Sequence, residues 1–226
     1  MAERLPAWVW LGAAVLSCVA GMVNVVGYLG FEHQAVSHLT GTTSLIGAAV
    51  ADGDGRLAGQ LFAVLMAFVL GAVASGLVIQ DSTLKLGRRY GLVLVVEAIA
   101  LVAAARAFQA HSLWGGWLAA FACGLQNAMV TTYSGSVVRT SHLSGMFTDL
   151  GIFLGHRLRG LPVPRRRLLL CLTITCAFFA GGVLGAILFG RVGYDALYLP
   201  AGVTGLTGAV YAAYRQLTAR GQAIGR

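Results

Sequence analysis

The feature that most constrains this chain is a series of apolar runs, each close to the roughly 20 residues that an α-helix needs to cross a bilayer. These runs lie at residues 7–29, 57–79, 91–108, 113–133, 167–190 and 196–214. Charged residues make up 11% of the chain, against about 25% of a typical soluble domain. Because so few charges cannot cover a water-facing surface, the composition excludes a soluble enzyme and a nucleic-acid-binding module. We therefore expect an all-α polytopic membrane protein, a single membrane domain over residues 1–226, whose first partner is the lipid bilayer.

Two shorter and more polar segments are similar to each other, which indicates an internal repeat. They cover residues 34–51 and 137–155. A Gly-x-x-Asn motif, ending at Asn24 or Asn127, precedes each segment. Thirteen residues after Asn24 and fourteen after Asn127 comes a Ser-His-Leu-Thr/Ser-Gly motif, whose two copies start at Ser37 and Ser141.

The similarity continues beyond these motifs. An Ala-Phe-x-x-Gly-x-Val sequence occurs at residues 67–73 and again at 177–183. Agreement in order, residue type and spacing predicts a duplicated unit, with one repeat at about residues 7–108 and the other at about residues 112–215.

The basic residues favour one topology for this duplicated chain. If the two motif segments enter the membrane and return, the chain has six crossings and inverted halves, and 13 of the 16 Lys and Arg residues share one face. If the two segments span, the chain has eight crossings and parallel halves, and the larger share is 11. The positive-inside rule favours the stronger asymmetry, so we expect an inverted 3+3 repeat in a bacterial inner membrane, with both termini cytoplasmic. Eight spans are the alternative.

The Ser-His-Leu-Thr/Ser-Gly motif is typical of a break in the backbone followed by a helix start. Thr40 and Ser144 are expected N-caps, and the glycine after each allows close approach of another group. A helix N-terminus at membrane depth offers free N–H groups to an anion or a carbonyl oxygen. Such interrupted segments, in matching positions of two halves, point to the binding site of a transporter.

His38 and His142 follow the serine of each motif. Each can bind a substrate or relay a proton, or it can brace the broken backbone. No carboxylate or cysteine is spaced around either histidine as a metal site requires, so we expect no metal and no cofactor. Adjacent Ser and His residues do not form a nucleophilic pair, and no hydrolase or nucleotide-binding motif is present, so we expect no enzyme and no catalytic residue.

Two acidic residues, Glu97 and Asp149, fall within apolar stretches. A buried carboxylate is costly and suggests function. Asp149 is the stronger candidate for a proton or cation site, and its alternative role is a structural pairing with Arg139 or a histidine. Glu97 has no acidic counterpart in the second repeat, where Leu206 is the nearest equivalent.

The amides of Asn24, Gln126 and Asn127 precede the breaks and can bond either loose backbone or substrate. Together with the motif residues they complete the candidate substrate-binding set. That set is Ser37, His38, Thr40, Gly41, Thr42, Ser141, His142, Ser144, Gly145, Asp149, Asn24, Gln126, Asn127 and Glu97. The small residues Gly181 and Gly185 allow close helix packing and are a candidate homodimer contact.

These motifs resemble those of the YoaK-like family of bacterial inner-membrane proteins, a domain of unknown function. The resemblance rests on Gly21-x-x-Asn24 with Ser37-His38-Leu-Thr40-Gly41-Thr42, and on Gly124-Leu-Gln126-Asn127 with Arg139-Thr140-Ser141-His142-Leu-Ser144-Gly145-x-x-Thr148-Asp149. Family members often carry Asp in place of Asn24 and Asn in place of Thr42. The resemblance implies a multi-span bacterial membrane protein without an established substrate.

Two functions follow from this reading. The first is a small-solute transporter or channel-like permease, whose central site takes a small polar or anionic solute between the two breaks. The alternative is a non-transporting membrane scaffold or assembly protein in which the breaks are structural.

Overall fold

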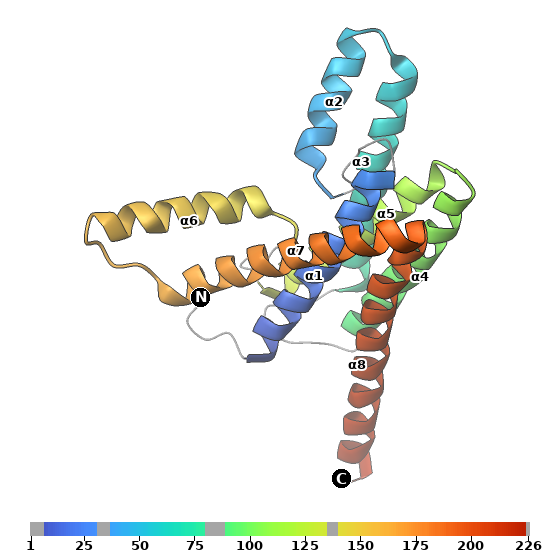
Figure 1. The fold of residues 1–226 in the computed structure, drawn as a ribbon. Coiled ribbons are helices and arrows are strands. Elements are labelled where there is room, and N and C mark those ends of the chain that lie inside the picture. Colours follow the sequence, from blue (N-terminus) through green and yellow to red (C-terminus); the bar gives the residue numbers. More distant parts are fainter. Residues whose placement is uncertain (1–6, 31–36, 80–88, 135–139, 225–226) are drawn as a thin grey trace.

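The computed structural model describes residues 7–30, 37–79, 89–134 and 140–224. Within these residues it is all-helical and contains no strand (Figure 1). The helices are α1 (Ala7–Gly30), α2 (Leu39–Ala51), α3 (Gly55–Val78), α4 (Arg89–Gln109), α5 (Trp114–Ser134), α6 (Leu143–Leu158), α7 (Arg165–Val192), the short 3-10 helix η2 (Gly193–Leu197) and α8 (Tyr198–Ile224). The six apolar runs correspond to α1, α3, α4, α5, α7 and α8, and the two polar segments correspond to α2 and α6.

Four stretches of the described residues are long and apolar enough to cross a membrane, as expected for a membrane protein. They are Val9–Gly30, Gly55–Val78, Arg89–Gln109 and Arg165–Ala213, the last of which contains both α7 and α8. Helix α5, which is not among these four stretches, is 21 residues long and carries Gln126 and Asn127 near its middle.

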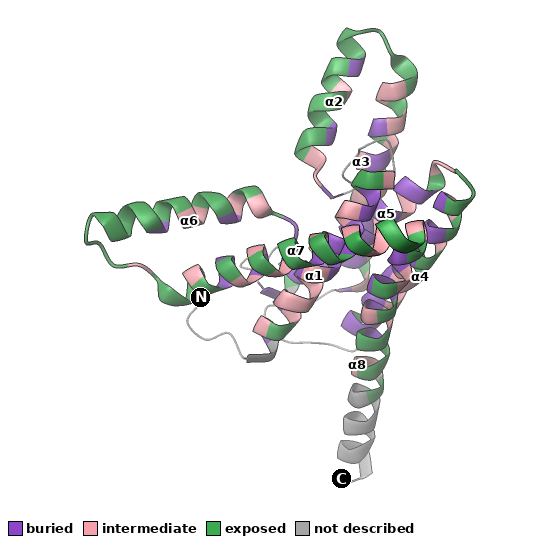
Figure 2. Ribbon diagram, viewed as in Figure 1, coloured by how far each residue is buried: buried purple, intermediate pink, exposed green. Residues whose placement is uncertain are grey.

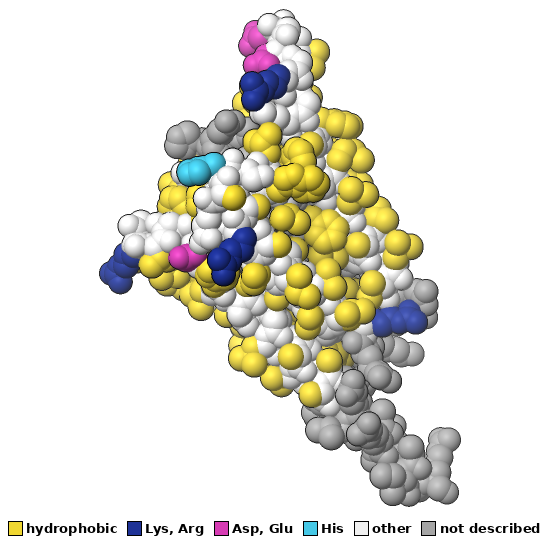
Figure 3. Space-filling view, turned by 90° about the vertical axis from the view of Figure 1, so that its right-hand side faces the viewer, with side chains coloured by type: hydrophobic (Ala, Val, Ile, Leu, Met, Phe, Trp, Pro, Cys, Tyr) yellow, Lys and Arg dark blue, Asp and Glu magenta, His cyan; other side chains and the backbone are white. Residues whose placement is uncertain are grey.

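The surface is as apolar as the composition requires. Leu77, Phe179 and Leu206 are about 70% exposed (72%, 72% and 68%), on three different helices. Figure 3 shows a face covered largely by hydrophobic side chains, with the charged side chains toward its edges. In water such a surface would aggregate, so these side chains are suited to contact with lipid.

Two close helix crossings build the centre of the molecule, and each joins an early helix to a late one (Figures 1 and 2). Helix α1 packs on α7, where a Cβ added to Gly21 would collide with the carbonyl oxygen of Phe178. Helix α3 packs on α5, where a Cβ added to Gly124 would collide with the carbonyl oxygen of Phe68. Only glycine allows the two backbones to approach this closely.

The partner helices contribute glycines to the same crossings. A Cβ on Gly181 of α7 would collide with the carbonyl oxygen of Cys18, and a Cβ on Gly71 of α3 would collide with that of Phe121. Each crossing is therefore lined by glycine from both helices. The four glycines belong to the motifs that the sequence pairs across its two halves.

Helices α4 and α8 form a third pair and run antiparallel. Gly91 approaches Gly208 so closely that an added Cβ would lie 2.7 Å from its carbonyl oxygen. Near the other end of α4, the guanidinium of Arg106 lies 5.9 Å from the ring centre of Tyr198, at the start of α8. The N-terminal part of α4 therefore contacts the middle of α8, and the C-terminal part of α4 contacts the N-terminus of α8, as antiparallel helices do.

The remaining helices form two hairpins that leave the centre in different directions (Figure 1). Helix α2 packs along α3, and the carboxylate of Asp54 caps α3 by accepting a hydrogen bond from the N–H of Leu57 at 2.9 Å. Helix α6 lies against α7 less extensively. Figure 2 shows α6 largely exposed, whereas buried residues concentrate where α1, α3, α4, α5 and α7 meet.

Candidate functional site

An asparagine holds each Ser-His break from the preceding helix. The carboxamide oxygen of Asn24 accepts hydrogen bonds from the hydroxyl (2.8 Å) and the N–H (3.3 Å) of Ser37. The carboxamide oxygen of Asn127 accepts hydrogen bonds from the hydroxyls of Ser141 (2.9 Å) and Thr140 (3.3 Å). Both amide oxygens therefore bind groups of the break itself, and Asn127 also lies in the lining of the cavity described below.

These bonds bring the chain back into the bundle. Asn24 lies six residues before the end of α1 at Gly30, which is about 9 Å along a helix axis. Because Ser37 contacts Asn24, the chain has returned by that distance when α2 begins. The second break repeats this arrangement, since α5 continues to Ser134 beyond Asn127.

The helices after the breaks start earlier than expected. The N-caps are His38 for α2 and His142 for α6, so the prediction of Thr40 and Ser144 as N-caps is wrong. The carbonyl oxygen of His38 already accepts bonds from the N–H groups of Gly41 (3.1 Å) and Thr42 (3.3 Å). The asparagine fixes the preceding serine, and helical geometry can begin directly after the histidine.

The two histidines have different surroundings. The His38 ring is half-buried and lies edge-on to Phe178 of α7, with ring centres 6.0 Å apart. The His142 side chain is exposed and lies over Gly145 of its own helix, where an added Cβ would be 2.6 Å from the ring carbon Cδ2. Neither histidine caps its helix with its side chain.

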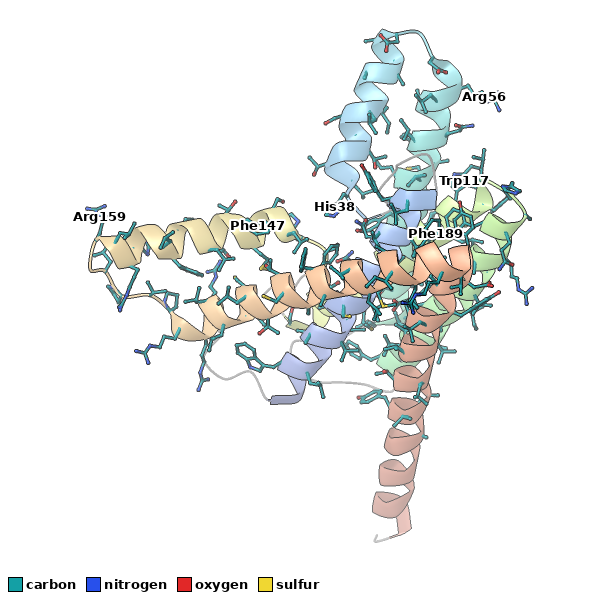
Figure 4. All side chains as sticks on the ribbon, in the orientation of Figure 1. His38, Arg56, Trp117, Phe147, Arg159 and Phe189 are labelled. Carbon is teal, nitrogen blue, oxygen red and sulfur yellow. The ribbon has the colours of Figure 1, made fainter. Side chains whose placement is uncertain are left out.

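Both breaks line one open cavity of about 490 Å³. His38 lies at its edge, at the foot of α2 (Figure 4). The cavity brings together seven of the candidate residues, namely Ser37, His38, Thr40, Asn127, Ser141, His142 and Ser144. Two segments more than 100 positions apart therefore share one site, to which α3 contributes the apolar side chains of Phe68 and Ala72.

The other candidates lie outside this lining. Gln126 is buried, and its amide donates a 2.8 Å hydrogen bond to the carbonyl oxygen of Leu16 on α1. Glu97 is 1% exposed on α4, and its Oε2 has no hydrogen-bond partner among the described residues. The remaining members outside the lining are Asn24, Gly41, Thr42, Gly145 and Asp149.

Asp149 forms an ion pair that the sequence did not identify. Its Oδ2 lies 3.0 Å from Arg167 at the start of α7, so the carboxylate joins α6 to α7. The expected partner Arg139 lies outside the described residues. Across the described part of the chain, no three His, Cys, Asp or Glu side chains are grouped so that they could hold a metal ion.

Six residues of the cavity are not in the candidate set predicted from the sequence, namely Leu39, Phe68, Ala72, Ala128, Thr131 and Thr132. Phe68 occurs in the repeated Ala-Phe-x-x-Gly motif, as does Phe178 beside His38, so the repeat already contained a signal for it. Thr131 lies four residues after Asn127 and Thr132 lies four residues after Ala128, so each is the helix-surface neighbour of another lining residue.

A family model described as "Protein of unknown function (DUF1275)" matches residues 12–210, which include both breaks and all residues of the cavity. No curated protein and no solved structure matches the chain. The expectation of a domain-of-unknown-function family is confirmed over nearly the whole length. The chain belongs to the DUF1275 family.

Proposed function

We propose that this protein is a small-solute transporter or channel-like permease of a bacterial inner membrane. The observation that carries the proposal is the single cavity shared by the two Ser-His breaks. Its volume of about 490 Å³ lies within the range of about 300–1,000 Å³ found for small-ligand sites. Because each half contributes one break, the site lies between the halves, as in transporters built from repeats.

The lining supports a small polar or anionic solute. Hydroxyl groups of Thr40, Thr132 and Ser144 and the imidazoles of His38 and His142 surround the cavity. The first turns of α2 and α6 also start at it, and helix N-termini favour negative charge and carbonyl oxygens. No cofactor and no catalytic group is part of the proposal, which is transport rather than enzymatic turnover.

The inverted repeat is part of this proposal, and the helix pairs support it. The contacts of Gly21 with Phe178 and of Gly124 with Phe68 correspond under the sequence match. Inverted halves require α4 and α8, the last helix of each half, to run in opposite directions, and their contacts do so. Parallel halves with eight crossings would require these two helices to run in the same direction.

Cysteine labelling tests the topology. In a background without the native cysteines, Asp54→Cys and Arg165→Cys are probed in intact cells with a membrane-impermeant thiol reagent. With six crossings the two hairpin ends lie on opposite faces, so we expect labelling of Asp54→Cys alone. Protection of both, with labelling restored on cell lysis, would indicate eight crossings.

Thermal stabilisation by solutes tests the function. The purified protein is melted with members of a library of small polar and anionic solutes, since a ligand at 100 times its Kd adds about 2.7 kcal/mol to stability. For a solute that stabilises, we expect His38→Ala and His142→Ala to weaken binding, and the double variant to lose less than the sum of the two.

The alternative, a non-transporting scaffold, is favoured by the bonds of Asn24 and Asn127, which give the breaks a structural role. It predicts no stabilisation by any solute and additive losses of stability for the two histidine variants.

The homodimer is also tested with the purified protein, by measuring its mass in detergent.

A further inference from the structure

The α6–α7 hairpin encloses a second cavity, separate from the one at the breaks. Its volume is about 660 Å³. Leu150, Phe153 and Leu154 of α6 and Leu168 of α7 supply apolar walls, and the lining also includes Arg157 and Arg165. An apolar cavity with two guanidinium groups is suited to a ligand that has both an apolar chain and an anionic group.

The charge around this cavity is strongly one-sided. The arginines where α6 ends and α7 begins are Arg157, Arg159, Arg165, Arg166 and Arg167. Asp149 is the only acidic residue between positions 140 and 192, and it is paired with Arg167 at 3.0 Å. Arg157 and Arg165 have no acidic partner among the described residues. Their charge is therefore available to an anion from outside the chain.

The cavity lies where a helix leaves the apolar part of the membrane. Arg165 is the first residue of α7 and of the apolar stretch Arg165–Ala213. Consecutive arginines at the start of such a helix remain near the lipid headgroups, because charge is costly in hydrocarbon. At this level the molecule most available to the cavity is a phospholipid.

We propose that the cavity between α6 and α7 binds one molecule of anionic phospholipid. Arg157 and Arg165 contact its phosphate through charge-assisted hydrogen bonds. One acyl chain lies against Leu150, Phe153 and Leu168. The site is independent of the solute cavity, so it can be present whether or not the protein transports.

The α2–α3 hairpin provides an internal control. Its turn carries Asp52 and Asp54 beside Arg56, so the acidic residues there outnumber the arginine. The turn is also compact, with Gly53 at a φ of +74° and Asp54 capping α3. Figure 4 shows Arg56 near the outer end of this hairpin and Arg159 at the outer end of the other.

The test uses the full-length protein purified in detergent and titrated with dioleoyl phosphatidylglycerol or dioleoyl phosphatidylcholine. We expect only the anionic lipid to raise Tm. In Arg157→Gln with Arg165→Gln, the mole fraction of lipid for half the shift should rise about 30-fold, since each arginine near anionic lipid changes affinity about fivefold. The matched control, Arg56→Gln with Arg191→Gln, should titrate like the wild type.

Chain recognition is tested separately from charge. Leu154→Gln keeps both arginines and places an amide in the cavity lining, so it should weaken phosphatidylglycerol binding. sn-Glycerol 3-phosphate, which lacks acyl chains, should give no shift. Equal shifts with both lipids, an equal loss in the control variant, or a full shift with glycerol phosphate would each overturn the proposal.

Discussion

The two Ser-His breaks share an anchor and differ in almost everything around it. In both, an asparagine oxygen one helix earlier holds the serine at 2.8 or 2.9 Å. The first histidine is half-buried against Phe178, whereas the second is exposed and folded over Gly145. The hairpin after the first break ends in a compact turn with two aspartates and one arginine, and the hairpin after the second has an arginine-rich end beside a cavity.

The comparison distinguishes the contacts that form both breaks from the contacts that only one break makes with its surroundings. An asparagine anchor occurs at each break and a glycine-lined crossing lies beside each, so these features define how the chain enters and leaves the centre. The ring contact of His38 with Phe178 has no counterpart at the second break, and the ion pair of Asp149 with Arg167 has none at the first. These contacts are therefore where the two halves can differ in stability, conformation and ligand.

The largest expected effect concerns the shared crossings. Gly21→Ala and Gly124→Ala would each place a Cβ against a backbone carbonyl oxygen, of Phe178 or Phe68, which cannot move aside alone. We expect each to lower stability by about 3 kcal/mol or more, because a tightly packed contact is overfilled. Melting in detergent measures this. Gly76→Ala has open space around its Cβ and should be neutral or slightly stabilising. A tolerated change at one crossing only would break the equivalence of the two halves.

The asparagine anchors come next. Asn24→Ala and Asn127→Ala remove the acceptor of two hydrogen bonds each and leave buried hydroxyl groups unpaired. We expect a loss of about 1–3 kcal/mol in both variants. When Asn24→Ala is combined with Ser37→Ala, or Asn127→Ala with Ser141→Ala, the loss of stability should be smaller than the sum of the two single losses. Equal, additive losses would show that the asparagines act through other contacts.

Replacing the two histidines should affect the stability of the protein to different degrees. His38→Ala removes a ring contact with Phe178 and should cost about 1 kcal/mol. His142→Ala affects an exposed side chain and should stay within about 0.5 kcal/mol. Differential melting of the two variants measures the contrast. Identical losses would mean that the two rings have equivalent surroundings in solution.

The smallest expected effect separates the two motif glycines. Gly41→Ala has open space around its Cβ, so helix propensity should make it slightly stabilising, by about 0.5–1 kcal/mol. Gly145→Ala meets the His142 ring, which must move, so this gain should be reduced. With His142→Ala already present, Gly145→Ala should recover the full gain. If Gly145→Ala were still less stabilising than Gly41→Ala in the His142→Ala background, the His142 ring would not be the cause of the difference.

The class of the protein and the local character of its segments can be predicted from the amino-acid sequence alone. Apolar runs of bilayer length and the scarcity of charge require lipid-facing helices, and these properties are read without knowledge of any contact. The Ser-His motifs likewise marked where α2 and α6 start to within a few residues, because helix starts depend on nearby backbone groups. The N-caps were misplaced by two residues because the anchoring asparagine lies thirteen or fourteen positions away.

Only the tertiary structure decided which helices meet and what each polar group contacts. The sequence paired Gly21 with Gly124 as copies, but it did not show that Gly21 faces Phe178 across α1 and α7. Nor did it show that Gln126 bonds to Leu16, or that Asp149 pairs with Arg167. Such contacts join residues far apart in the chain and depend on how whole helices cross. A local pattern specifies the face that a helix presents, whereas the partner of that face is selected by packing among all the helices.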